Sequence, residues 1–470
     1  GQVLSYSYDE LGRKTAEYTG DTPGDPAKAL AEWTYDSLGK GMPVSSTRYV
    51  GGKSGSAYVK KVNGYNAVGQ PTGTTTVIPA VEGNLAGSYS TTASYTETVS
   101  LLASTTFGTE AGLPAETVGY GYNLQGKLVA MGTPSRPYIA TVAYSPQGQV
   151  LQTTLGTPSK QLRTAQTWDQ ATGRLATNRV TLQSNTANPI SATTYGYNAA
   201  GSVTAVSDVQ SSGGTDRVTD TQCFGYDAQN RLTTAWTDTK GLGAVTAGQL
   251  TKCATAAPSP GTIGGPSPYW LDWQFNQLGD RTQQVAHDVK GAATKDVTQT
   301  ITYPGAGVTP AKKPNAASAV TTTGPSGSTT VVPDYDSAGN TKTRTGPGTS
   351  QAFEYNEEGR TKAVTTNGTE AGYLYDADGS LLIQRNPGTN LLYLFGGAEQ
   401  LRLDTVKKTV TGLRYYHSPD GTVIVRSSAG TVSYQPTTPH GTAQLQVDGA
   451  SLAVVRRAYD PYGNARGAAP

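Results

Sequence analysis

Residues 335–379 read YDSAGNTKTRTGPGTSQAFEYNEEGRTKAVTTNGTEAGYLYDADG, and one short pattern begins three times in this stretch, at positions 335, 355 and 375. The pattern is an aromatic residue, Asp or Asn, two free positions and Gly. Strict copies number ten, where chance would give about one. They are Tyr8-Asp9 with Gly12, Tyr35-Asp36 with Gly39, Tyr65-Asn66 with Gly69, Tyr122-Asn123 with Gly126, Tyr197-Asn198 with Gly201, Phe275-Asn276 with Gly279, Tyr335-Asp336 with Gly339, Tyr355-Asn356 with Gly359, Tyr375-Asp376 with Gly379 and Tyr459-Asp460 with Gly463. Looser copies begin at Tyr144, Trp168 and Tyr226.

Each position of the repeat has a physical role that predicts a hairpin. The Asp or Asn side chain can accept a hydrogen bond from the backbone two residues on and so start a turn. The Gly supplies a positive φ without steric cost. Polar and apolar residues then alternate, as in Ser202-Val203-Thr204-Ala205-Val206, which is typical of a strand. One repeat therefore predicts one β-hairpin of about 20 residues.

Neighbouring repeats are expected to pack on one another. We expect the aromatic residue of each repeat to stack on that of the next repeat. We also expect the basic residue after the Gly to lie over such a ring; these residues are Arg13, Lys40, Lys127, Arg174 and Arg360. A hairpin of this size cannot bury a core alone, but many stacked in order form a continuous sheet that twists and can close around a cavity. The sequence predicts an all-β fold of tandem hairpins, stacked into a spiralling sheet that forms a hollow shell or part of one.

The composition of the 470-residue chain supports a thin wall with wet surfaces. Only 15% of the residues are charged, and Tyr outnumbers Phe 28 to 5. Tyrosine combines an apolar ring with a hydrogen-bonding tip, which suits a wall with water on at least one side. The formal net charge of +2 gives no electrostatic footprint for nucleic acid. No apolar run is long enough to span a membrane.

The two cysteines leave two possibilities open. Cys223 and Cys253 are too far apart in sequence for a CxxC motif. In a secreted protein they can pair and close a loop worth roughly 3 to 4 kcal/mol in the chain-entropy model. The alternative is two separate buried thiols. Because the chain starts at Gly1 without a signal peptide, we expect it to be a fragment of a longer secreted protein.

The tandem motifs resemble those of the YD-repeat or Rhs (rearrangement hotspot) family, which includes bacterial Rhs proteins, C components of insecticidal Tc toxins, wall-associated bacterial proteins and teneurin ectodomains. The resemblance covers nearly the whole chain. It is most specific in the C-terminal third, where the segments similar to Rhs arrays of high-GC Gram-positive bacteria are 373–379, 393–403, 413–416, 440–445 and 456–463. The segment 223–270 looks like the same lineage. By sequence character the array, residues 1–470, divides into N-terminal repeats (1–220), repeats with long Gly/Pro/Ser-rich loops (221–334) and C-terminal Rhs-like repeats (335–470).

The resemblance implies a hollow cocoon that encloses a C-terminal toxin domain. In the family, the array ends in a core-associated motif, which an aspartate-based self-cleavage site follows in many members. Neither that motif nor a toxin domain occurs in these 470 residues, so no self-cleavage residue is assigned here. The resemblance implies the protein's own toxin domain as cargo and names no cofactor.

Active-site patterns are weak in this sequence. His287, His417 and His440 have no metal-binding spacing, and no GxSxG element occurs, so we predict neither a metal site nor catalytic residues. Repeat carboxylates are expected to be turn residues, with Ca²⁺ binding at sites such as Asp376-Ala377-Asp378 as the alternative. The Tyr series is expected to pack between repeats, with glycan stacking as the alternative.

The leading hypothesis is a non-enzymatic, secreted or cell-surface shell segment of an Rhs-type polymorphic toxin. The alternatives are an adhesion module that binds cell-surface carbohydrates and an extracellular fibre. Exposure of the aromatic cluster Tyr269-Trp270-Leu271-Asp272-Trp273 would favour adhesion, and burial of that cluster would weaken it. The sequence does not predict the oligomeric state.

Overall fold

The computed structural model describes residues 3–212, 214–243, 251–304 and 313–467. It contains 35 strands and only short 3-10 helices, so the predicted all-β fold is confirmed. Each strand pairs antiparallel with the next strand in the chain, from β1 to β35. The protein is therefore one continuous meander, as expected for hairpins stacked in sequence order. No helix in the described part of the chain has the length and apolar character needed to cross a membrane.

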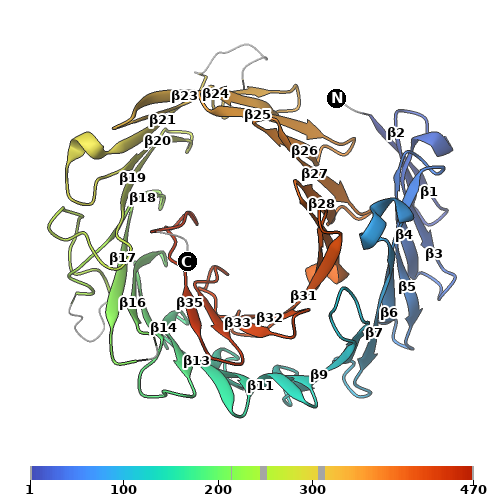
Figure 1. The fold of residues 1–470 in the computed structure, drawn as a ribbon, viewed down its shortest axis with the longest axis horizontal. Helices are drawn as coiled ribbons and strands as arrows, with labels where there is room; N and C mark the ends of the chain where they lie inside the picture. The colour runs from blue at the N-terminus through green and yellow to red at the C-terminus, as the bar shows by residue number, and fades with distance from the viewer. Residues whose placement is uncertain (1–2, 213, 244–250, 305–312, 468–470) are drawn as a thin grey trace.

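The sheet coils into a spiral of more than one turn, because strands added in one direction accumulate twist and curvature (Figure 1). We call the first part the outer coil. Its strands are β1 (Leu4–Tyr8), β2 (Lys14–Thr19), β3 (Ala29–Tyr35), β4 (Pro43–Val50), β5 (Ser56–Tyr65), β6 (Pro71–Ile78), β7 (Gly87–Tyr95), β8 (Leu102–Phe107), β9 (Glu116–Tyr122), β10 (Leu128–Thr133), β11 (Arg136–Tyr144), β12 (Val150–Thr157), β13 (Lys160–Trp168), β14 (Leu175–Leu182), β15 (Ser191–Tyr197), β16 (Val203–Gln210), β17 (Val218–Tyr226) and β18 (Leu232–Thr237).

The rest of the spiral comprises a connecting wall and an inner coil. The connecting wall contains β19 (Trp270–Phe275), β20 (Arg281–Ala286), β21 (Val297–Thr302), β22 (Ala319–Gly324), β23 (Gly327–Tyr335), β24 (Thr341–Gly346), β25 (Thr349–Tyr355) and β26 (Thr361–Thr366). The inner coil contains β27 (Thr369–Tyr375), β28 (Leu381–Asn386), β29 (Thr389–Leu394), β30 (Glu399–Asp404), β31 (Thr409–His417), β32 (Val423–Ser427), β33 (Val432–Gln435), β34 (Leu445–Asp448) and β35 (Val454–Arg456). The 3-10 helices are η1 (Pro26–Lys28), η2 (Ala80–Leu85), η3 (Ala293–Lys295) and η4 (Phe395–Gly397).

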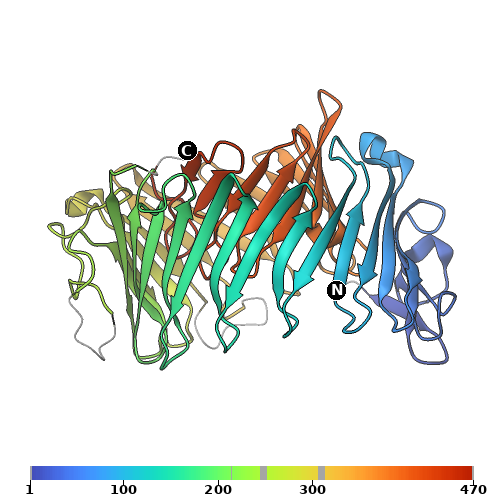
Figure 2. The same ribbon diagram turned by 90° about the horizontal axis from the view of Figure 1, so that it is seen from below.

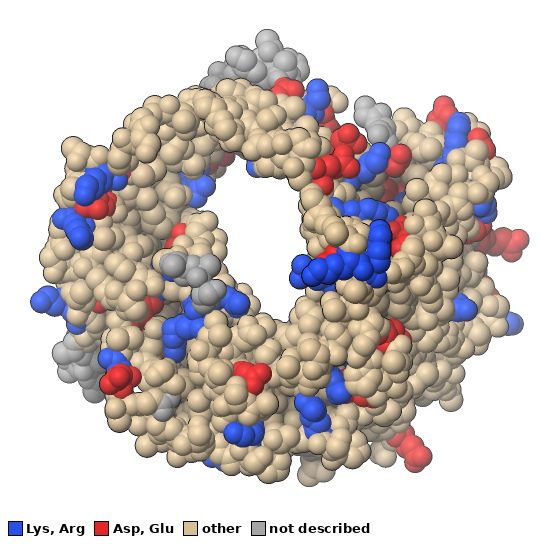
Figure 3. Space-filling model, in the orientation of Figure 1, with Lys and Arg blue, Asp and Glu red and all other residues tan. Residues whose placement is uncertain are grey.

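The inner coil lies inside the outer coil, so the wall is two layers thick where the coils overlap (Figure 1). The strands run obliquely across the height of the resulting belt (Figure 2). An opening passes through its centre, and charged side chains are scattered over the visible face (Figure 3). Strands β1 and β35 do not pair with each other, so the sheet is a spiral and not a closed barrel.

Two hydrophobic cores fill the space between the layers, because strands of both coils turn their apolar faces toward each other. One core joins β5–β7 and η2 to β28–β30; it contains Tyr58, Ile78, Leu85, Tyr89, Leu382, Ile383, Leu392, Leu394, Leu401 and Leu403. The larger core joins β8–β14 to β31–β34 and includes Phe107, Val118, Tyr138, Leu155, Leu162, Tyr416, Ile424, Tyr434 and Val447. Burial of these side chains holds the two layers together.

The connecting wall is a single layer for most of its length. Between Trp273 and Ala363, none of the residues that the structure describes (274–304 and 313–362) is buried. Thr-rich strands such as β22 and β24 supply side chains that tolerate water on both faces. The sheet also runs unbroken through the boundaries at 220/221 and 334/335, since β17 and β23 span them. The threefold division of the array remains a prediction from sequence character.

Candidate functional site

The repeat motifs form the turns at one rim of the belt, because every motif before the one at Tyr459, which follows β35, joins an odd-numbered strand to the next even-numbered one. The Asp or Asn accepts a hydrogen bond from the backbone N–H four residues on in ten turns, which are those of Asp9, Asn66, Asn123, Asn198, Asp227, Asn276, Asp336, Asn356, Asp376 and Asp460. In seven of these turns it also accepts from the N–H two residues on. The motif therefore has the turn chemistry expected for it.

The glycine of the motif has a positive φ at Gly12, Gly69, Gly126, Gly201, Gly279, Gly339, Gly359, Gly379 and Gly463. Asn230, which replaces Gly in the repeat at Tyr226, adopts φ 62°. The turn after Tyr35 departs from the prediction. There Asp36 has φ 73° and Gly41 has φ 83°, whereas Gly39 does not have a positive φ. Two more residues in this turn move the left-handed position from Gly39 to Gly41, and the carboxylate of Asp36 accepts the N–H of Gly41 at 2.6 Å.

The prediction that motif aromatics stack on one another is wrong, since none of the ring pairs found among the described residues joins motif aromatics of successive repeats. Instead, the polar tips of twelve aromatics donate to backbone carbonyls over 2.6–3.1 Å, and in all but one of these bonds the acceptor is the first residue of an earlier strand. These bonds are Tyr35 to Lys14, Tyr65 to Pro43, Tyr95 to Pro71, Tyr122 to Leu102, Tyr144 to Leu128, Trp168 to Val150, Tyr197 to Leu175, Tyr226 to Val203, Tyr303 to Arg281, Tyr335 to Ala317, Tyr355 to Thr341 and Tyr375 to Thr361. We call this series the tyrosine ladder.

Two members of the ladder, Tyr95 and Tyr303, lie in long gaps between sequence motifs and identify degenerate repeats there. In five repeats the basic residue after the positive-φ position lies over the ring of the next motif, whereas Lys40 makes no such contact among the described residues. Such pairs are Arg13 over Tyr35, Lys127 over Tyr144, Arg174 over Tyr197, Arg231 over Phe275 and Arg360 over Tyr375, at 4.4–5.6 Å from the ring centre. Ring pairing with a cation thus takes the place of ring–ring stacking.

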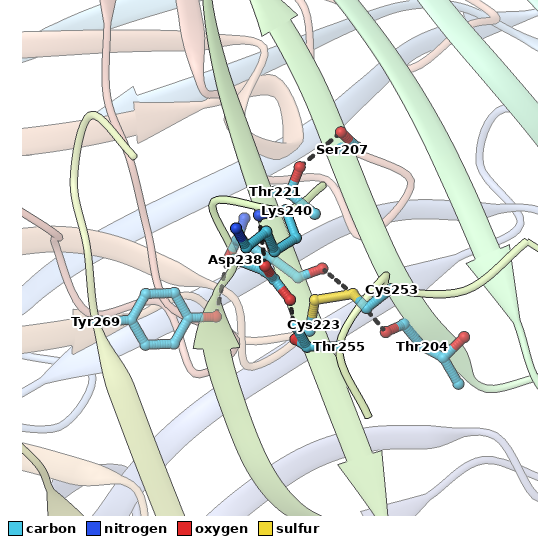
Figure 4. Close-up of a disulfide and its surroundings, with 10 residues drawn as sticks. Thr204, Ser207, Thr221, Cys223, Asp238, Lys240, Cys253, Thr255 and Tyr269 are labelled. Carbon is cyan, nitrogen blue, oxygen red and sulfur yellow. Dashed lines mark hydrogen bonds between the residues drawn. A yellow bond between two sulfur atoms is a disulfide. The ribbon is translucent and has the colours of Figure 1, made fainter. Parts of the chain in front are cut away.

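Cys223 and Cys253 form a disulfide with a Cα–Cα distance of 6.0 Å. Cys223 lies on β17 and is fully buried, whereas Cys253 lies in the long loop between β18 and β19. Figure 4 shows that the bond ties this loop to the wall beside Thr204 and Tyr269. The disulfide therefore anchors the loop between β18 and β19, which the pairing of neighbouring strands does not hold in place.

The structure brings together a second group of residues that the motif analysis did not identify. Ion pairs join the outer coil to the inner part of the spiral at intervals along the overlap, and we call them the seam. The seam consists of Arg48–Glu358, Lys60–Asp376, Lys60–Asp378, Glu82–Arg385, Glu110–Arg414, Glu116–Arg414, Glu116–Arg426, Asp208–Arg456 and Asp220–Arg466. From Glu82 onward, the outer coil always supplies the carboxylate and the inner coil the guanidinium. Asp376 and Asp378, the alternative Ca²⁺ position, thus face Lys60.

The most buried part of the seam is a cluster around Arg414 that we call the clasp: Glu110, Glu116, Glu399, Arg414 and Arg426, with Tyr138 and Tyr416. The alternation of side chains along β30 and β31 determines where the inner-coil residues of the clasp lie. Glu399, Leu401 and Leu403 share the buried face of β30, and Arg414 lies directly opposite Glu399 on β31. Both side chains have zero exposed area. A charged pair on an otherwise apolar face is the sequence signal by which the clasp could have been found.

Arg414 has an acceptor for each of its five N–H donors. Its Nε donates to Glu399 at 2.5 Å, and its two terminal nitrogens reach the carbonyls of Pro114 and Gly108 at 2.6 and 2.5 Å. They also reach the carboxylates of Glu116 and Glu110 at 3.5 and 3.1 Å. One inner-coil side chain therefore ties down the outer-coil segment that leads into β9.

A second layer of the clasp surrounds Glu116. Its carboxylate accepts from Tyr138, Tyr416 and Arg426, and the rings of Tyr138 and Tyr416 stack at 4.5 Å. Burial raises the pKa of the Tyr416 hydroxyl, so it remains a donor at neutral pH. Burial also raises the pKa of Glu399 to about 7, although Arg414 opposes this shift. The arrangement fixes the register of the two layers.

The described residues hold no group of three or more His, Cys, Asp or Glu side chains arranged for a metal ion. His287, at the end of β20, is held between Asp272 and Asp296 at 2.9 and 2.8 Å and lies against the ring of Trp270. It therefore closes a loop of the connecting wall.

The spiral wall, the rim of motif turns and the seam define a class of protein, a coiled β-hairpin shell. Solved chains with this fold occur in Tc toxins. The crystal structure of TcdB2-TccC3 matches 99% of this chain at TM-score 0.73 and 16% identity, over 24% of its own length. The TcdB2-TccC3-TEV crystal structure matches 99% at TM-score 0.71 and 16% identity, over 23% of its length. The Photorhabdus luminescens Tc holotoxin pore with a mutated TccC3 matches 99% at TM-score 0.66 and 15% identity, over 23% of its length.

The chain thus spans about a quarter of the length of the chains that it matches. No protein-family model and no curated protein matches it. At this identity the likeness establishes the fold.

Proposed function

We propose that the chain is a wall segment of a secreted Rhs-type shell that encloses or presents a polypeptide effector, with a structural and not a catalytic role. The observation that carries this proposal is the match of 99% of the chain to TcdB2-TccC3. Because the chain spans about a quarter of the matched chains, enclosure is proposed for the whole protein, to which this segment contributes.

The geometry supports a wall. The overlap of the coils makes a two-layered belt around an opening, and the seam and the cores hold the layers in one register. Strands of the single-layered part such as β22 and β24 are rich in threonine, so they give an enclosed chain few large apolar side chains on which to collapse. A polypeptide effector, the protein's own C-terminal toxin domain by resemblance, is the proposed content.

Secretion is supported by the Cys223–Cys253 disulfide, since such bonds persist in oxidising compartments. The adhesion alternative loses the feature that favoured it. Tyr269, Leu271 and Trp273 are buried in a small core, so they are not an exposed glycan-stacking surface. The structure thus favours a wall over a carbohydrate-binding module.

The test is protease protection of the natural secreted protein, followed by intact mass measurement and sequencing of every polypeptide that remains. We expect a polypeptide beyond the wall to survive protease in native buffer and to be digested once denaturant opens the shell. A protein that protects no other polypeptide and instead binds cell-wall glycans would refute the proposal.

A further inference from the structure

The clasp has an unequal number of buried acids and bases. Three carboxylates, Glu110, Glu116 and Glu399, meet two guanidinium groups, Arg414 and Arg426. With every group ionised, the clasp would carry one uncompensated negative charge. A buried charge without a partner is costly in a low-dielectric interior, and taking up one proton removes that cost.

Glu399 is the carboxylate at which the proton fits best. Its Oε2 accepts from Arg414, whereas its Oε1 is buried and has no hydrogen-bond partner among the described residues. The carboxylate of Glu116, by contrast, accepts from two tyrosines and two arginines. Glu110 retains some exposure and Glu399 retains none. A proton on Oε1 neutralises Glu399 and leaves its bond to Arg414 in place.

The charged and titratable groups around Glu399 come from all the elements packed near it. They are Arg414 and Tyr416 on β31, Arg426 on β32, Glu110 before β9, Glu116 at the start of β9, Tyr89 on β7, Tyr138 on β11, and Glu82 of η2, which Tyr58 and Arg385 hold. Glu110 and Glu116 act against ionisation of Glu399, and Arg414 acts for it. No further cation reaches Glu399 among the described residues, so the excess of carboxylates persists.

We propose that the clasp holds one proton, on Glu399, and that release of this proton near neutral pH loosens the contact between the outer and inner coils. The device acts through the two segments that the clasp joins, Gly108–Glu116 and β30–β31. It is independent of what the shell encloses.

The direction of the effect follows from linkage. Burial, with a smaller contribution from Glu110 and Glu116, raises the folded-state pKa of Glu399 from 4.5 to about 7. With the coils separated, the carboxyl is solvated and its pKa returns to its ordinary value. The joined state therefore binds more protons between about pH 4.5 and 7. The stabilising effect of the proton is fully present below this range and is lost as the pH rises through about 7.

The test compares the wild-type chain with Glu399→Gln, which keeps the acceptor for Arg414 and is neutral at every pH. Amide hydrogen exchange of β30 and β31 is measured in both chains from pH 4 to 8.5, and the wild-type rate is divided by the variant rate to cancel intrinsic exchange. We expect a ratio near one at pH 4 that rises to about three hundredfold at pH 8.5, since each pKa unit is a tenfold change and the pKa of Glu399 rises from 4.5 to about 7. Glu32→Gln is the matched control, because Glu32 pairs with Lys53 far from the clasp, and its ratio is expected to be flat.

Infrared difference spectroscopy provides a second readout that does not depend on folding of a variant. The wild-type chain should show the C=O band of a protonated carboxyl at pH 6 that disappears as the pH rises to 8.5. A flat exchange ratio for Glu399→Gln, or the absence of this band from the wild-type spectrum at pH 6, would overturn the proposal.

Discussion

Replacing Arg414 with methionine should weaken the overlap more than any other single change in the seam. Arg414 has zero exposed area, and all five of its N–H groups are engaged, two of them by the carbonyls of Gly108 and Pro114. Loss of one partner from a buried ion pair costs about 3–5 kcal/mol. Each carbonyl left without a donor adds about 1 kcal/mol or more, and proton uptake by the carboxylates returns part of the total. We expect Arg414→Met to lower the free energy of unfolding by about 4 kcal/mol.

The measurement is urea unfolding at constant pH, followed by tyrosine fluorescence and circular dichroism. Arg402→Met is the matched control, because Arg402 lies one strand away on the exposed face of β30. Its cost should stay within about 0.5 kcal/mol. If Arg414→Met is no more costly than Arg402→Met, then the clasp does not hold the coils and our account of the overlap is wrong.

Three further predictions concern the wall. Tyr375→Phe removes one bond of the tyrosine ladder and should lower the free energy of unfolding by about 1 kcal/mol in urea titration. Gly359→Ala, at φ 77°, should cost about 1–2 kcal/mol, whereas Gly39→Ala should cost less because Gly39 does not have a positive φ; thermal unfolding of both variants measures the difference. Reduction of the Cys223–Cys253 bond should lower the free energy of unfolding by roughly 3–4 kcal/mol, measured by calorimetry with and without reductant.

Each of these predictions has a control within the chain. Tyr8, the first motif tyrosine, is 60% exposed, and Tyr8→Phe should change the stability little. Equal losses for Tyr8→Phe and Tyr375→Phe would show that the ladder bonds do not stabilise the sheet. Equal losses for the two alanine variants would contradict the turn geometry after Tyr35. The Cys223→Ser/Cys253→Ser double variant should match the reduced protein, and full stability of that variant would contradict the role of the disulfide.

The hairpins and their turns were predictable from the sequence because they depend on residues within a few positions of each other. Asp9, Gly12 and Arg13 lie in one turn, and all three make the interactions that their chemistry favours. The hydrogen bonds that the motif tyrosines donate from their hydroxyl groups to backbone carbonyls were not predicted. A ring can stack or can donate from its hydroxyl, and only the spacing of strands in the folded sheet decides between the two.

The overlap of the coils could not be predicted from local pattern. Arg414 and Glu116 are 298 residues apart, and although the apolar face of β30 marks Glu399 as unusual, nothing local to either strand shows that Glu116 lies against Arg414. Arg414 is buried because it shares a face of β31 with Tyr416. The alternation of residues along β31 does not by itself show which of its two faces is the buried one. Whether the sheet passes back inside itself depends on the coiling accumulated over the whole array, and small differences in twist per strand decide it.

The single-layered wall between Trp273 and Ala363 also gives the belt an uneven mechanical character. The bending stiffness of a sheet rises steeply with its thickness. The overlapped arc is therefore stiff, and the single-layered arc bends more easily. A load that pushes outward from the centre will be taken up as strain in β20–β25, where the backbone hydrogen bonds act without a core behind them. The belt will therefore widen by flexing along one arc, and the overlapped arc will keep its shape.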